Sequence, residues 1–226
     1  MSQSRTKTLV LDDAATQGCW GPGAEVVVTS HTLQYDDAQL AIIESVDPST
    51  GKITLVDGIH APITIEDDNQ TAVEVALLTR NVLFTAEEEP VFIGGHVIIM
   101  HTQIPQNIVG LEIQGFGQQG LMGRYPLHFH MCFSSSGSLV AKNTVRDSHQ
   151  RGFVVHATHD LMLKENIAYN TKGHAFMLED GGEQNNTFYR NLGAVSRGVE
   201  KRINDDESDN NPSTFWVTNP VNTFVE

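Results

Sequence analysis

The residues best suited to chemistry are histidines and carboxylates that end short apolar stretches. The sequence contains LHFH at 127–130, FVVH at 153–156 and FMLED at 176–180. Imidazole and carboxylate groups bind transition metals, transfer protons near neutral pH or hydrogen-bond sugar hydroxyls. These stretches therefore indicate metal binding, acid–base catalysis or glycan binding, and the alternative is a set of surface residues that pair only for local stability.

Alternation along a strand predicts where these side chains point. Every second residue of a strand faces the same side. The residues expected to face inward are Leu127, Phe129, Phe153, Val155, Phe176 and Leu178. The residues expected to face outward are His128, His130, His156 and Glu179.

An internal repeat predicts how the stretches are arranged. KNTVRDS at 142–148 matches ENIAYNT at 165–171 with an offset of 166 − 143 = 23 residues, and a looser third copy begins at Asn191. Coils of this length with asparagine at a recurring turn are typical of a parallel β-helix, in which each coil buries its inner face only by stacking on the next. Leucine-rich repeats have a similar period, but their leucine-rich consensus is absent. We therefore predict an all-β chain with a right-handed parallel β-helix.

Stacking of the coils predicts a candidate site. Neighbouring coils lie about 4.8 Å apart, so His130, His156 and Glu179 should form one outward column that could bind one divalent metal ion. Glu179, Asp180 and His156 are the candidate catalytic residues. In glycoside hydrolysis, one carboxyl group would be the acid and its partner the base or nucleophile. The candidate substrate-binding residues are Arg124, His128, Arg151, His174 and Lys172, although the position of Arg151 and His174 beside a turn favours a role in stabilising that turn.

Residues 1–85 have a different pattern from residues 86–226. Short apolar strands and a turn signal, DPSTG at 47–51, predict antiparallel hairpins in the first region. We expect this β-rich module to cover an end of the β-helix, since an open coil end is an unpaired sheet edge. The chain stops within a predicted strand, which suggests a fragment of a longer protein.

Bulk properties limit the classes of partner. The formal net charge is −14, which disfavours nucleic acid because a polyanion would be repelled. The same objection applies to an acidic polysaccharide, unless basic residues form a local strip or a divalent cation bridges the charges. No apolar run is long enough to insert into a membrane, and residues 1–7 contain no signal-peptide core. The two cysteines, Cys19 and Cys132, could be two buried thiols or could form one disulfide bridge. We expect the protein to be a monomer.

Several motifs occur in the order seen in one known family. They are ALLTRNV at 76–82, GGH at 94–96, GRYPLHFH at 123–130, VH at 155–156, KGHAFMLEDG at 172–181 and STFWVTNP at 213–220. They resemble the β-helix region of the family that contains the cell-migration-inducing hyaluronan-binding protein, transmembrane protein 2 (a cell-surface hyaluronidase) and the fibrocystin-like proteins. The resemblance implies parallel β-helix repeats in an extracellular or cell-surface multidomain protein, in which a G8 domain precedes this region.

The resemblance supports two hypotheses of function. Some members of the family bind and depolymerise hyaluronan, so the chain is predicted to bind or cleave a hyaluronan-type glycosaminoglycan, as a hyaluronidase-like glycoside hydrolase if it is an enzyme. Fibrocystin-like members have no such established activity. The alternative is therefore a structural or adhesive ectodomain segment, in which the histidine column is structural or binds a metal.

Overall fold

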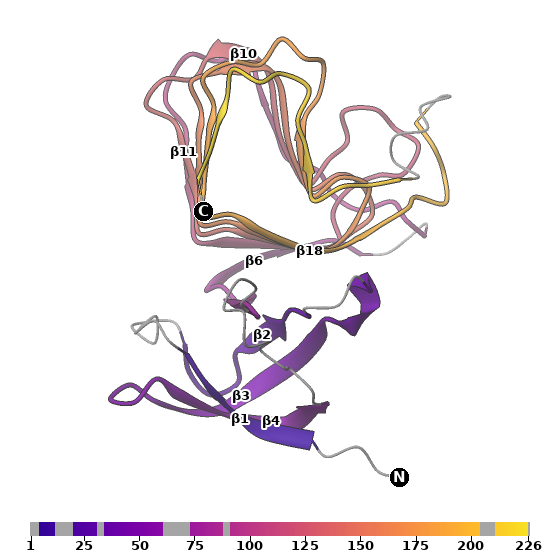
Figure 1. Ribbon diagram of the computed structural model, residues 1–226. Helices are drawn as coiled ribbons and strands as arrows, with labels where there is room; N and C mark the ends of the chain where they lie inside the picture. The colour runs from indigo at the N-terminus through magenta and orange to yellow at the C-terminus, as the bar shows by residue number, and fades with distance from the viewer. Residues whose placement is uncertain are drawn as a thin grey trace. The chain divides into compact units, whose positions relative to one another are not determined.

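The structure is a computed structural model that describes residues 5–11, 20–30, 34–60, 73–87, 91–203 and 211–225 (Figure 1). The chain divides into two compact units, residues 1–79 and 80–226. Within the described ranges the elements are β-strands, apart from a single 3-10 turn at Tyr35–Asp37. The predicted fold class, a parallel β-helix after an antiparallel β module, is confirmed.

The first unit is a five-stranded antiparallel sheet in the order β1-β4-β3-β2-β5. Its strands are β1 (Arg5–Val10), β2 (Glu25–Val28), β3 (Gln39–Asp47), β4 (Lys52–His60) and β5 (Val75–Leu77). The predicted hairpin turn joins β3 to β4, and Asp47 accepts hydrogen bonds from the Ser49 side chain at 2.6 Å and the Thr50 side chain at 2.8 Å. These bonds hold the pKa of Asp47 below its ordinary value. The turn chemistry thus fixes the register of the hairpin.

The second unit is built from three parallel five-stranded sheets, and Figure 1 looks along its stacked coils. One sheet contains β7 (Ile98–Met100), β10 (Leu127–Ser134), β13 (Phe153–His159), β16 (Phe176–Leu178) and β19 (Phe215–Trp216). The second contains β8 (Asn107–Val109), β11 (Leu139–Ala141), β14 (Met162–Lys164), β17 (Thr187–Tyr189) and β20 (Thr223–Val225). The third contains β6 (Val82–Thr85), β9 (Leu111–Gln114), β12 (Thr144–Ser148), β15 (Ile167–Lys172) and β18 (Leu192–Arg197).

Strand β6 pairs in parallel with β9 of this unit. The boundary after residue 85, and the covering of a coil end by the N-terminal module, stay predictions.

Asparagines hold one corner of the coils together. Asn143 Nδ2 donates to Asn166 Oδ1 at 3.0 Å, and Asn166 Nδ2 donates to Asn191 Oδ1 at 2.9 Å. Each asparagine follows a residue with positive φ, namely 55° at Lys142, 54° at Glu165 and 52° at Arg190. The side chains of Asn143 and Asn166 also accept from backbone amides and donate to backbone carbonyls. The predicted offset of 23 residues is confirmed, and the asparagine at the recurring turn links each coil to the next.

We expect Asn166→Ala to lower the free energy of unfolding by about 1–3 kcal/mol, because it leaves buried backbone groups without their partner. Asn166 is completely buried. Urea unfolding followed by circular dichroism measures the change. Asn107→Ala, at an exposed position of β8, is the matched control and should change the stability by less than about 0.5 kcal/mol. Equal losses in both variants would contradict a special role for the ladder.

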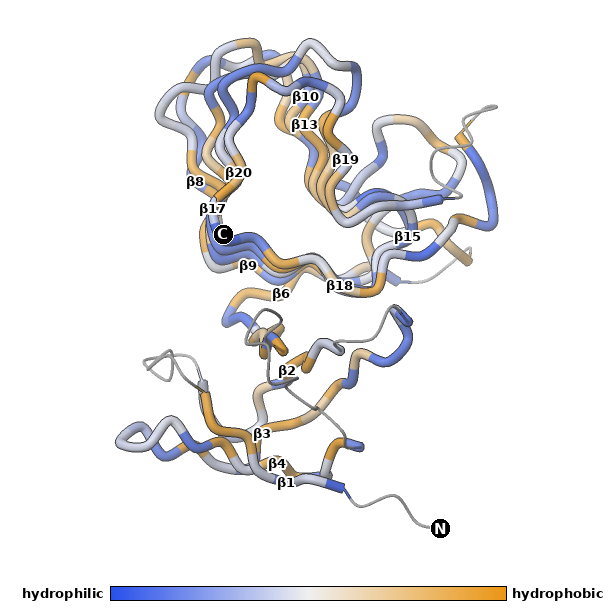
Figure 2. Tube along the Cα trace, viewed as in Figure 1, coloured by the Kyte–Doolittle hydropathy of each residue, from blue (hydrophilic) through white to orange (hydrophobic). Residues whose placement is uncertain are grey.

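The predicted inward residues form the core of the β-helix. Leu127, Phe129 and Val155 are at most 2% exposed. The Phe153 and Phe176 rings stack at 4.9 Å between centroids, and Phe215 continues the stack at 5.0 Å. In Figure 2 the strands β10, β13 and β19 are largely hydrophobic. Cys132 is a buried thiol in this core, and Cys19 lies outside the described residues.

A second apolar cluster lies against the outer face of the same sheet. It contains Tyr125, Val154, Met177 and Ile203, with Trp216 packed against them. Val154 and Met177 alternate with inward residues of β13 and β16, so their side chains leave the coil on its outer side. Outward side chains of this sheet are therefore not all exposed to solvent.

Candidate functional site

The pairing register of β10, β13 and β16 places the predicted column of His130, His156 and Glu179 side by side on one sheet. His130 is the strand partner of His156, and Val155 is the partner of Leu178, which precedes Glu179. His156 Nδ1 lies 2.9 Å from His130 Nδ1 and 3.5 Å from Glu179 Oε2. With His128 and Asp180, these residues form what we call the histidine–carboxylate cluster.

His128 points outward as predicted, yet it is completely buried. Its ring lies 4.9 Å from the Tyr125 ring and 5.0 Å from the His130 ring. Nδ1 is 3.2 Å from the Gly123 carbonyl oxygen, which can only accept, so Nδ1 carries the proton. Nε2 is buried without a hydrogen-bond partner, 3.7 Å from Glu179 Oε2. Burial lowers the pKa of His128 to about 3, so the imidazole is neutral at physiological pH.

Two donors hold the Glu179 carboxylate. The Tyr125 hydroxyl donates to Oε1 at 2.7 Å, and Arg151 donates to the same oxygen at 2.9 Å. Arg151 also donates to the Tyr125 oxygen at 3.1 Å. Burial raises the pKa of Tyr125 well above its ordinary value, so the phenol stays a donor. Because Oε1 is occupied in this way, Oε2 is the oxygen that faces the histidines.

Asp180 shares a hydrogen bond with a second carboxyl group, Glu183. Asp180 Oδ2 lies 3.3 Å from His156 Nε2, and the Asp180 side chain is 47% exposed. Glu183 is completely buried and accepts hydrogen bonds from the Ala157 and Gly181 amides, both at 2.9 Å. A hydrogen bond from Glu183 lowers the pKa of Asp180, while burial raises the pKa of Glu183. Asp180 is therefore the ionised member of the pair.

The other predicted substrate-binding residues lie in different surroundings. Arg124 contacts His96, with 2.8 Å between Arg124 Nη1 and His96 Nε2. His174 is buried, with Nδ1 3.2 Å from Ser213 Oγ and its ring 4.6 Å from Trp216. Of the five, His128 and Arg151 are therefore the two that the described contacts join to Glu179.

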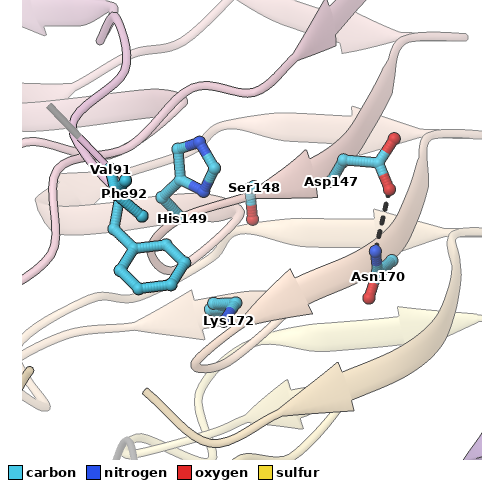
Figure 3. A pocket seen from close by; sticks show the side chains of 7 residues that line it. All are labelled: Val91, Phe92, Asp147, Ser148, His149, Asn170 and Lys172. Carbon is cyan, nitrogen blue, oxygen red and sulfur yellow. Dashed lines mark hydrogen bonds between the residues drawn. The ribbon is translucent and has the colours of Figure 1, made fainter. Parts of the chain in front are cut away.

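Lys172 lines a separate pocket of about 190 Å³ (Figure 3). Its ammonium group contacts Glu200 and lies 4.4 Å from the centre of the Phe92 ring. In the same pocket Asn170 donates to Asp147 at 2.8 Å, and Asn170 accepts from Arg197 at 2.8 Å. These bonds run from coil to coil, so Asp147 and Asn170 stabilise a corner of the β-helix.

Three parts of the cluster's surroundings were not singled out from the sequence: the hydroxyl of Tyr125, the carbonyl of Gly123 and the carboxyl group of Glu183. Tyr125 and Gly123 precede strand β10, and Glu183 follows β16. A signal was present for Tyr125, because it lies inside the motif at 123–130, but periodicity does not place a residue outside a strand.

The fold and the site define a class of protein: a parallel β-helix with a histidine–carboxylate cluster on the outer face of one sheet. The family model described as the CEMIP beta-helix matches residues 92–226. The chain belongs to this family.

The sequence of the chain is also similar to individual proteins. The chain is 30% identical to the human cell surface hyaluronidase CEMIP2 over 215 aligned residues, which cover 84% of the chain and 15% of that protein. It is 28% identical to a G8 domain-containing protein of Dictyostelium discoideum over 243 residues (98% of the chain and 16% of that protein) and 29% identical to human fibrocystin-L over 271 residues (96% and 6%). The chain thus spans a sixth or less of the length of these relatives.

No helix in the part of the chain that the structure describes is long and apolar enough to cross a bilayer.

Proposed function

We propose that this chain is part of an extracellular protein that binds and depolymerises a hyaluronan-type glycosaminoglycan at the histidine–carboxylate cluster. The observation that carries the proposal is the Glu179 carboxylate, held through Oε1 by Tyr125 and Arg151 while Oε2 faces His156. Groups held rigidly by their neighbours are what catalysis of bond cleavage requires. The names of the relatives, among them two cell surface hyaluronidases, support the choice of substrate class.

Two carboxyl groups with different surroundings fit the chemistry of glycoside hydrolysis. Asp180 is ionised and partly exposed, which suits a base or nucleophile, whereas Glu179 is 14% exposed and lies on the other side of the His156 ring. We therefore assign cleavage of the glycosidic bond to both groups: Asp180 acts as the base or nucleophile, and Glu179 carries on Oε2 the proton that it gives to the leaving-group oxygen. His128 and Arg151 act by positioning these groups.

A second candidate function follows from the burial of the cluster. His128 and Tyr125 are completely buried and Arg151 is 2% exposed, as expected for groups that stabilise a fold. Fibrocystin-L, which aligns over nearly the whole chain, is a relative that is not named as an enzyme. The alternative is thus a non-catalytic structural or adhesive ectodomain segment, in which the cluster joins neighbouring coils.

Incubation of the purified chain with hyaluronan and, separately, with chondroitin distinguishes these functions. The proposal expects binding in a sedimentation assay and shorter chains by gel electrophoresis, with and without added divalent cations. If neither polymer is bound or shortened in any condition, the proposal is wrong. Removal of a bound metal that lowers thermal stability without changing glycan binding would favour the structural alternative.

A further inference from the structure

Two histidines of the cluster use one ring nitrogen for a supporting contact and direct the other to a common centre. His128 donates from Nδ1 to the Gly123 carbonyl, which leaves the lone pair of Nε2 facing the cluster. His156 Nε2 lies 3.3 Å from Asp180 Oδ2, and its Nδ1 faces His130 and Glu179. Metal-binding histidines almost always have such a carbonyl or carboxylate on the second nitrogen, where it fixes the tautomer.

We propose that His128, His130 and His156 bind one divalent transition-metal ion, with Glu179 Oε2 available as a further ligand. The proposal deepens the proposed function, because the ion would lie beside Glu179. The prediction made from the sequence named His130, His156 and Glu179, and the structure adds His128, whose buried Nε2 has no hydrogen-bond partner.

The distances between the donor atoms suit one ion. One nitrogen from each of the three histidines lies within 4.8 Å of the others. Two ligands bound to a tetrahedral zinc ion at about 2.0–2.1 Å are roughly 3.3 Å apart. The corresponding distances are 2.9 Å from His156 Nδ1 to His130 Nδ1, 3.5 Å from His156 Nδ1 to Glu179 Oε2 and 3.7 Å from His128 Nε2 to Glu179 Oε2. The three histidine nitrogens as a set lie within 4.8 Å of one another, so the rings would have to close by up to about 1.5 Å to share one ion.

The donor set selects the class of ion. Three imidazoles and one carboxylate favour zinc, cobalt, nickel, copper or iron, whereas calcium and magnesium prefer oxygen ligands. His156 is 23% exposed and His130 is half-buried, so solvent reaches the cluster from one side. With His156 as a ligand, proton transfer in glycan cleavage falls to Asp180, and to Glu179 when its Oε2 does not bind the ion. The ion would also offset the repulsion between a polyanionic glycan and a chain of net charge −14.

Metal binding by the full chain, prepared without a polyhistidine tag and stripped with a chelator, tests the proposal. We expect isothermal titration with Zn²⁺ to give one ion per chain, and Co²⁺ to give visible absorption bands of a nitrogen-rich site. His130→Gln and His156→Gln should weaken Zn²⁺ binding at least 100-fold, and Asp180→Asn about 10- to 100-fold, the scale for a supporting group. His60→Gln, on the exposed end of β4, is the control and should bind as the unmodified chain does.

Two results would overturn the site: no stoichiometric binding of Zn²⁺ or Co²⁺ by the unmodified chain, or equal affinity in both cluster variants and the control. Because His130 and His156 are only half-buried, their variants remain informative if His128→Gln fails to fold. The site and the glycan function can fail separately. If the chain binds stoichiometric metal but does not cleave glycan, the metal site is supported and the proposed function is not. If the chain cleaves glycan but binds no metal, the proposed function is supported and the metal site is not.

Discussion

Replacing Glu179 by glutamine should reduce the rate of hyaluronan cleavage by about 100- to 10,000-fold, the range for loss of a group that transfers a proton. Glutamine has nearly the same shape, and its carbonyl oxygen can still accept from Tyr125 and Arg151. It has no charge and takes no proton. The release of new reducing ends from hyaluronan measures the initial rate.

The matched control for this variant is Glu165→Gln. Glu165 is partly exposed at a corner of the coil and pairs only loosely with two lysines, at 3.7 and 3.8 Å. We expect this variant to cleave hyaluronan at the rate of the unmodified chain. Thermal unfolding of both variants checks that the fold is intact. If Glu179→Gln keeps the full rate, the carboxylate is not catalytic and the proposed chemistry must be abandoned.

The coil register could be predicted because it leaves a periodic signal. Each coil must put apolar residues inside and asparagine at the same corner, so the offset between Asn143 and Asn166 also gives the pairing of Phe153 with Phe176. The same alternation placed His130 beside His156, although their separation is 26 residues. The column of His130 and His156 could be predicted because each histidine stands at the end of an apolar stretch. That position on the strand does not change when a loop between two strands becomes longer.

The supports of the site could not be predicted by the same reasoning. Tyr125 and Glu179 are 54 residues apart, and Tyr125 belongs to the loop before β10 rather than to a strand. The burial of His128 and Arg151 also depends on this loop and on the apolar cluster that covers the outer face. Strand alternation says only that a side chain leaves the coil, and it carries no information about what covers that side chain.

Replacing Arg151 by methionine should lower the free energy of unfolding by about 3–5 kcal/mol, because removal of one partner leaves a buried charge without compensation. Arg151 is 2% exposed and donates to both Glu179 and Tyr125. Denaturant unfolding in the presence of a chelator measures the loss without a contribution from bound metal. Arg190→Met, at an exposed corner, is the control and should change stability by less than about 0.5 kcal/mol.

The double variant Arg151→Met, Glu179→Gln separates charge from packing. A neutral side chain at 179 no longer needs the guanidinium, so the double variant should be more stable than Arg151→Met alone, with a coupling of about 1–3 kcal/mol. Arg151 also lies 5.5 Å from the centre of the Tyr125 ring, and methionine only partly replaces that contact. If the double variant is as unstable as Arg151→Met, then Arg151 acts through its packing under Tyr125, and Glu179 does not depend on it as a counter-charge.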